Sequence, residues 1–169
     1  MLRRTQPMAQ VVLLAVLAAC SGTRGGQPSD PLPRGESVRW TGTIKGAERK
    51  SGTVSKNGGA EVFNGSVVLV PDAADPTRSE IRITLSGATT NTMLSWALLP
   101  DRCGSGAVPV LPLSSFGFLE MGMNGRAELT KQLPFDFPIG GIYHVAIYAG
   151  HRAVLEDVIA CANLALRKG

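Results

Sequence analysis

Apolar and polar residues alternate along several short segments of the chain. The clearest case is residues 79–87, where isoleucine or leucine at every second position alternates with charged and hydroxyl side chains. The same period of two recurs around Trp40, Trp96 and Leu129, and residues 142–148 are rich in β-branched and aromatic side chains. Alternation of this kind is typical of strands that bury one face and expose the other.

Turn-forming residues separate these segments. An Asn-Gly pair is the strongest short hairpin signal, because both central residues of a type I′ turn need a positive φ. About eight short strands with such turns between them predict an all-β fold, an antiparallel sandwich or barrel. The turn signals are Asn57-Gly58-Gly59, Pro71-Asp72, Ser86-Gly87, Asn124-Gly125 and Gly140-Gly141.

The last segment, residues 151–168, fits a helix as well as a strand. It contains no glycine or proline, and its apolar positions would form one stripe along a helix. Periodicity alone therefore favours a C-terminal helix over a strand. The stripe would contain Val154, Leu155, Val158, Ile159 and Ala162.

The first 20 residues have the pattern of an export signal. Arg3 and Arg4 precede residues 11–19, an apolar stretch that is shorter than the roughly 20 residues a membrane span needs. Leu17-Ala18-Ala19-Cys20 then resembles the lipobox of bacterial lipoproteins. The resemblance implies a signal peptide over residues 1–19 and acyl chains such as palmitate on Cys20. The alternative is an ordinary signal peptide that contains a cysteine.

Residues 20–36 then form a lipidated cysteine and a tether. The segment is rich in glycine, proline and serine, which predicts a flexible chain with an r.m.s. reach of about 20 Å. Ser21, and not the aspartate typical of inner-membrane retention, follows Cys20. We therefore expect a lipid-anchored protein of the cell envelope, on the periplasmic face of the outer membrane. Residues 37–169 remain as one domain, long enough to bury a single core.

Charge argues against a nucleic-acid partner. The formal net charge of the whole chain is +4, and removal of Arg3 and Arg4 with the signal peptide lowers it by two. The densest basic region, residues 39–56, is interrupted by Glu48 and carries no interleaved stacking platform. Export makes a nucleic-acid partner less compatible still.

Three cysteines are present, and two remain once Cys20 is lipidated. Cys103 and Cys161 would then share an oxidising compartment, where they form either a disulfide or two unpaired buried thiols. A disulfide between them would close a loop of about 60 residues and stabilise the fold by about 4 kcal/mol in the loop-entropy account.

Four motifs in the second half of the chain carry a family resemblance. They are WALLPDRCG (96–104), NGRAELTKQLP (124–134), GIYHVAIYAG (141–150) and VIACANL (158–164). In order and spacing they resemble the C-terminal half of copper–zinc superoxide dismutase-like and chordin-like (CHRD) domains. The resemblance implies a Greek-key β-sandwich of about eight strands with one disulfide, Cys103–Cys161. It also implies that Val158–Leu164 is the closing strand and not a helix.

The metal ligands of the copper–zinc enzymes are missing from this chain. Residues 95–98 stand where the family has a His-x-His, residues 104–122 contain no His or Asp, and Ile147 stands at the last ligand position. His144 and His151 are the only histidines; we expect His144 on an exposed or edge strand face. Because a redox copper site needs several imidazoles around one ion, we expect no metal, cofactor or catalytic residue.

Two apolar loop regions are the candidate binding surface. Large apolar side chains in or beside loops either cap the end of the core or form an exposed patch. Sandwich domains commonly bind through such loops, so this is where we expect a partner. The candidate patch residues are Phe116, Phe118, Met121, Phe135 and Phe137.

The sequence thus predicts a lipid-anchored envelope protein that is not an enzyme. Its β-domain would bind or support an unidentified envelope protein or ligand, and the membrane would be a partner through Cys20. The alternative from another class is a metal-dependent redox protein related to copper–zinc superoxide dismutase.

Overall fold

The computed structural model describes residues 38–47, 63–87, 90–150 and 157–169. All of them belong to one compact unit, Gly35–Gly169. The elements of this described part are β1 (Val38–Gly46), β2 (Asn64–Pro71), β3 (Ser79–Ser86), β4 (Met93–Pro100), the 3-10 helix η1 (Leu113–Ser115), β5 (Phe118–Glu120), β6 (Arg126–Leu133), β7 (Tyr143–Tyr148), β8 (Val158–Asn163) and β9 (Ala165–Lys168).

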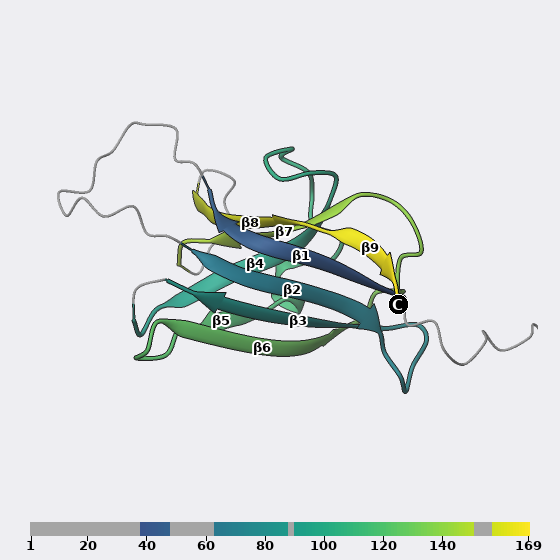
Figure 1. Ribbon diagram of the computed structural model, residues 1–169, viewed down its shortest axis with the longest axis horizontal. Helices are drawn as coiled ribbons and strands as arrows, with labels where there is room; N and C mark the ends of the chain where they lie inside the picture. Colours follow the sequence, from purple (N-terminus) through teal and green to yellow (C-terminus); the bar gives the residue numbers. More distant parts are fainter. Residues whose placement is uncertain (1–37, 48–62, 88–89, 151–156) are drawn as a thin grey trace, which may run out of the picture. The chain divides into compact units, whose positions relative to one another are not determined.

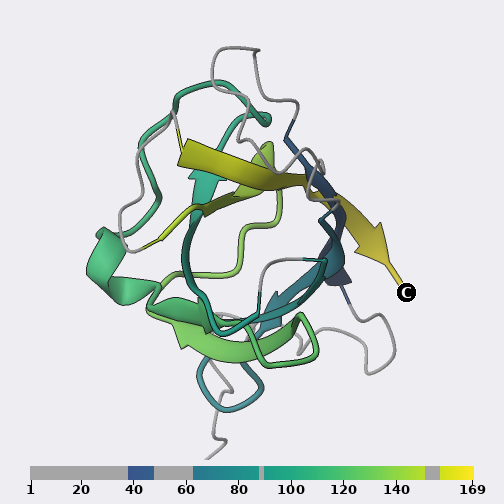
Figure 2. The same cartoon turned by 90° about the vertical axis from the view of Figure 1, so that its left-hand side faces the viewer.

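Eight of these strands form one continuous, nearly closed antiparallel sheet (Figure 1). Their order is β5-β4-β7-β8-β1-β2-β3-β6, and β9 pairs with β1 beside β8. The two ends of this order, β5 and β6, follow each other in the chain. Strand β7 returns to pair with β4, although β5 and β6 intervene in the chain. The all-β, antiparallel prediction is therefore confirmed, with one sheet curled around the core (Figure 2).

Strands β2, β3 and β6 show the alternation that the sequence predicts. Every second side chain points into the core, and the side chains between them point outward. Cross-strand pairing aligns these positions in rows, so that each row is wholly inner or wholly outer. One inner row is Val67, Ile83 and Leu129; the next, outer, row is Ser66, Thr84 and Glu128.

Strands β4 and β7 are buried on both faces. All residues from Leu94 to Leu99 are buried, and so are those from His144 to Tyr148. The inner face packs into the core, where Trp96 lies edge-on to Phe116 with ring centroids 5.0 Å apart. Continuous burial on two faces explains why β4 reads as an apolar run and not as a clean alternation.

The C-terminal segment is extended where the structure describes it. Residues 158–163 form β8, so the helix that periodicity favoured is wrong for these residues and the closing strand is confirmed. At Leu164, whose N–H donates to the Tyr143 carbonyl at 2.9 Å, the chain leaves β8 and continues as β9 along β1. A Cβ on Gly42 of β1 would lie 2.7 Å from the Asn163 carbonyl oxygen, so only glycine fits under this crossing.

The turn between β5 and β6 differs from the expected type I′ turn. Gly125 has a φ of 66°, but Asn124 is not among the residues with a positive φ. The N–H of Gly125 donates to the Gly122 carbonyl at 3.0 Å. The N–H of Gly122 donates to the backbone carbonyl of Arg126 at 2.8 Å. This is a tight turn that ends in a left-handed glycine, a common hairpin alternative.

Several sequence-based predictions fall on residues outside the described part. These include the signal peptide, Cys20, the tether and His151. Among the residues that are described, none belongs to a helix with the length and apolar character needed to cross a membrane.

Candidate functional site

The loop that follows β4 is fastened across the neighbouring strands. Cys103 forms a disulfide with Cys161 of β8, with the two Cα atoms 6.1 Å apart. The backbone N–H of Cys103 also donates to Oδ1 of Asn163 at 2.8 Å. The pairing that the family resemblance implied is therefore confirmed. The disulfide and this hydrogen bond together hold the loop against β8.

His144 is buried, contrary to the expectation of an exposed or edge histidine. Strand β7 lies between β4 and β8, so it has no free edge. The Nδ1 atom of His144 lies 2.9 Å from the carbonyl oxygen of Asp101, the residue that opens the disulfide loop. The side chain thus holds the loop over the outer face of β7. Within the described residues, no three His, Cys, Asp or Glu side chains gather closely enough to hold a metal ion.

No metal-binding side chain stands at the position where the family resemblance implies the last metal ligand. Ile147 pairs with Trp96 and is wholly buried in the core. The next row joins Tyr148 and Ser95, and it points to the other face of the sheet. The Ser95 hydroxyl is buried and has no hydrogen-bond partner. Burial also raises the pKa of Tyr148 above its ordinary value, so this phenol stays protonated at neutral pH.

The five residues of the candidate binding patch do not form one surface. Phe116 and Met121 are buried, which contradicts a place for them in an exposed patch. They fill the core because the segment around η1 plugs the side of the sheet next to Trp96. Phe135 and Phe137 are half-buried against the core, and Phe118 is exposed over 41% of its surface. Four of the five residues therefore pack in or against the core and do not form an exposed patch.

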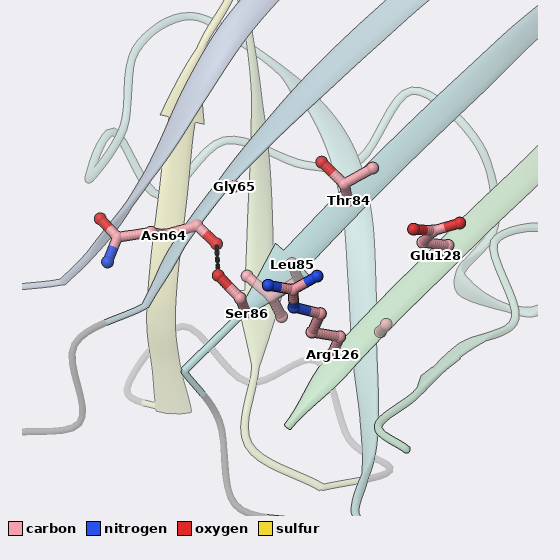
Figure 3. Close-up of a pocket in the computed structure, with 8 residues that line it drawn as sticks. Asn64, Gly65, Thr84, Leu85, Ser86, Arg126 and Glu128 are labelled. Carbon is pink, nitrogen blue, oxygen red and sulfur yellow. Dashed lines mark hydrogen bonds between the residues drawn. The ribbon is translucent and has the colours of Figure 1, made fainter. Parts of the chain in front are cut away.

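A shallow polar hollow lies on β2, β3 and β6 (Figure 3). It has a volume of about 220 Å³, and Arg126 and Glu128 of β6 extend over it from one side. The hydroxyl of Ser86 donates to the Asn64 carbonyl at 3.1 Å. Arg126 is the one cationic residue that lines the hollow. Because both charged side chains are exposed and lie on one strand, they can meet a small polar ligand but enclose none.

Three cations gather where β1 begins and β9 ends. Arg39 stands directly opposite Arg167, and Lys168 stands opposite Val38. All three cationic side chains are exposed, and none makes an ion pair within the described ranges. Like charges that face each other across a strand pair are destabilising. The facing arginines therefore disfavour the pairing of β1 with β9.

Two exposed isoleucines lie on the loop between β6 and β7. Ile139 is 87% exposed and Ile142 is 50% exposed, on either side of Gly140-Gly141. The indole N–H of Trp40 donates to the Pro138 carbonyl at 2.7 Å, which fixes this loop against β1. We define the β1–β9 end as Arg39, Arg167 and Lys168; β1 begins and β9 ends beside the C-terminus in Figure 1.

Sequence reasoning overlooked the β1–β9 end. Its cations lie about 130 residues apart in the chain and meet only through strand pairing.

No protein-family model matches the chain. A search of curated proteins finds no similar sequence.

Proposed function

We propose that this chain is a lipid-anchored protein of the bacterial cell envelope with a non-catalytic, binding β-domain. The observation that carries the proposal is Leu17-Ala18-Ala19-Cys20, at the end of a short apolar stretch. The acyl chains would hold the protein on the membrane, and the tether would carry the domain.

The disulfide supports export. Cys103 and Cys161 are bonded, and such bonds form and persist in oxidising compartments outside the cytosol.

The side chains at the positions of the expected ligands support a binding role over catalysis. Where the family resemblance places histidines stand residues 95–98 and Ile147. None of these side chains offers an imidazole or carboxylate for a redox metal. The exposed polar and basic surfaces of the sheet are then the parts available to a partner.

Metabolic labelling tests the anchor. Cells that express the chain are grown with an alkyne-labelled palmitate, and the label on the protein is measured after fractionation. We expect label in the membrane fraction for the natural chain and for Cys103→Ser, the matched cysteine control. Cys20→Ala should lose the label and accumulate as a precursor or as released protein. Equal labelling of Cys20→Ala would refute the anchor.

The second candidate, a metal-dependent redox protein, is favoured by one observation. The resemblance that implies a metal site also implied the Cys103–Cys161 pair, and that pair is present. Elemental analysis of protein purified from envelopes separates the two functions. One tightly held copper or zinc per chain, lost in His144→Ala, would replace the binding role with the redox role.

A further inference from the structure

We propose that the outer face of β1, β2, β3 and β6 binds an acidic polysaccharide, a chain of sugars that carries carboxylate groups. The inference rests on the proposed binding role and names the class of partner that the domain takes. We define the polar face as the outward side chains of these four strands together with Arg167 of β9; the four strands lie side by side in Figure 1.

The polar face is one surface because the strand register aligns its side chains. On each of the four strands, core residues alternate with exposed or half-buried ones, so the outward positions share one side of the sheet. Pairing then continues these positions from strand to strand in rows. The first row is Lys45, Asn64, Ser86 and Arg126; the second is Thr43, Ser66, Thr84 and Glu128; the third is Thr41, Val68, Arg82 and Thr130.

Charge distinguishes the polar face from the rest of the described surface. A sheet face that meets water needs polar side chains but no excess of one charge. The polar face nevertheless carries five of the nine cationic side chains that the structure describes, and only two of the eight side-chain carboxylates. The other described residues therefore have an excess of negative charge. The five cations are Arg39, Lys45, Arg82, Arg126 and Arg167, and the two carboxylates are Glu80 and Glu128.

Four of these five cations have no counter-charge among the described residues. Arg82 forms an ion pair with Glu80, with Nη2 and Oε1 2.6 Å apart, and the described part of the chain contains no other ion pair. Arg126 extends over the polar face without a carboxylate partner (Figure 3). Arg39 and Arg167 face each other, which disfavours strand pairing. An anionic partner would supply the missing counter-charges.

Uncharged polar groups lie between the cations. Lys45 stands six positions after Arg39 on β1, which separates the two by about 20 Å along the strand. The second row crosses this interval with the hydroxyls of Thr43, Ser66 and Thr84, and those of Ser66 and Thr84 are 2.9 Å apart. Hydroxyl groups both donate and accept hydrogen bonds. They suit the hydroxyls of a sugar chain, and the cations on either side of them suit its carboxylates.

The side chains of the polar face favour sugars over nucleic acid or a membrane. None of the described side chains on this face is aromatic, so it offers no platform on which bases could stack. Its outward aliphatic side chains, Val68 and Val70, are half-buried and cannot enter the acyl region of a bilayer. The hollow beside Arg126 is shallow, which suits a polymer that continues past it better than an enclosed small ligand.

Polymer binding by the full chain tests the proposal. The protein is extracted from envelopes with a nonionic detergent and titrated with polygalacturonate, whose sugars carry carboxylates. We expect binding that salt weakens, since the cations are exposed. Polygalacturonate whose carboxylates are methyl-esterified should bind about tenfold more weakly. Polyacrylate, which has carboxylates but no sugar hydroxyls, and single-stranded DNA should also bind more weakly than polygalacturonate.

Matched charge variants locate the contact. Arg126→Gln should weaken the binding of polygalacturonate about threefold. Arg102→Gln removes the same charge from the exposed disulfide loop and should change the binding less than about 1.5-fold. Arg39→Gln with Arg167→Gln should weaken it about tenfold. This double change should not weaken the fold, because it removes two like charges that face each other.

Thr84→Val tests the hydroxyl row. Valine keeps the branched shape of threonine and removes only its hydroxyl group. The variant should bind polygalacturonate about threefold more weakly at low and at high salt, and should bind polyacrylate as the natural chain does. Circular dichroism checks that each variant is folded.

Four results would overturn the proposal. They are equal binding of the natural and the esterified polymer, equal losses in Arg126→Gln and Arg102→Gln, binding of polyacrylate as tight as that of polygalacturonate, and tighter binding of DNA, which would assign the face to nucleic acid. Each of them leaves palmitate labelling of Cys20 unchanged, so failure of the polysaccharide surface is distinguishable from failure of the anchor.

Discussion

Two parts of the sheet differ in what covers their outer faces. Strands β2, β3 and β6 bury only their inner side chains and present hydroxyl and charged groups outward. Strands β4 and β7 bury both faces, and the disulfide loop reaches their outer side through Asp101 and Cys103. We refer to the first set as the open strands and to the second as the covered strands.

The difference teaches where the fold is sensitive. An open strand depends on one layer of packing, so its outer positions tolerate polar and charged residues. A covered strand depends on the core and on the loop over it. The loop is a cover held by the disulfide, by His144, and by hydrogen bonds from the Cys103 N–H to Asn163 and from the Val110 N–H to the Leu98 carbonyl. The same outer position should therefore differ in cost between the two sets.

The largest contrast is expected for a charge placed on each outer face. Ala97 lies on the covered outer face of β4 and is fully buried, whereas Thr130 lies on the exposed outer face of β6. Ala97→Glu buries an unpaired carboxylate and should lower the free energy of unfolding by about 5 kcal/mol. Thr130→Glu should change it by less than about 0.5 kcal/mol. Urea denaturation measures both, and similar values would end the distinction.

Removing the disulfide should have the next largest effect. Cys103→Ser is expected to lower the free energy of unfolding by about 4 kcal/mol, and Cys161→Ser by a similar amount, because either change removes the same cross-link. Hydrogen exchange should rise more in β7 and β8 than in β2 and β3, since the cover is lost. Uniform exchange through the sheet would contradict the role of the loop as a cover.

The sequence predicted the open strands more fully than the covered ones. Ile81, Ile83 and Leu85 alternate with polar residues because one side of β3 meets water. The run from Leu94 to Leu99 has only Ser95 as a polar residue, so pattern alone could not say what covers its second face. That face is set by residues far away in the chain, such as Cys161.

Aromatic loop residues were the least predictable part of the site. Phe116 and Phe118 are two positions apart, yet the first is in the core and the second is half exposed. Composition gave no means of separating them, because η1 and the positive φ of Gly117 determine which side chain turns inward. The β1–β9 end was equally hidden, since Arg39 and Arg167 meet only after the sheet forms.

Truncating Phe116 and Phe118 to alanine distinguishes the side chain that fills the core from the one that lies at the surface. Phe116→Ala should lower the free energy of unfolding by about 3 kcal/mol, since it leaves a cavity against Trp96. Phe118→Ala should lower it by less than about 1 kcal/mol. Thermal denaturation of both variants beside the natural chain gives the comparison. A larger loss for Phe118→Ala would show that the plug has been assigned to the wrong side chain.

The smallest expected effect is a pH dependence at Tyr148 of the covered strands. Burial raises the pKa of this phenol above its ordinary value of 10.0 in the folded protein. The unfolded chain therefore loses the proton first, so the stability is present below about pH 10 and declines above it. Tyr148→Phe should flatten the decline between about pH 9 and pH 11. An unchanged pH profile would mean that the phenol is solvated in the folded state.

The most direct test of the central claim is the mass of the N-terminal peptide of protein taken from the cell envelope. A lipid-anchored protein should give a peptide that begins at Cys20 and carries the added mass of acyl chains on that residue. A peptide that begins at another residue, or an unmodified Cys20, would contradict the lipid anchor.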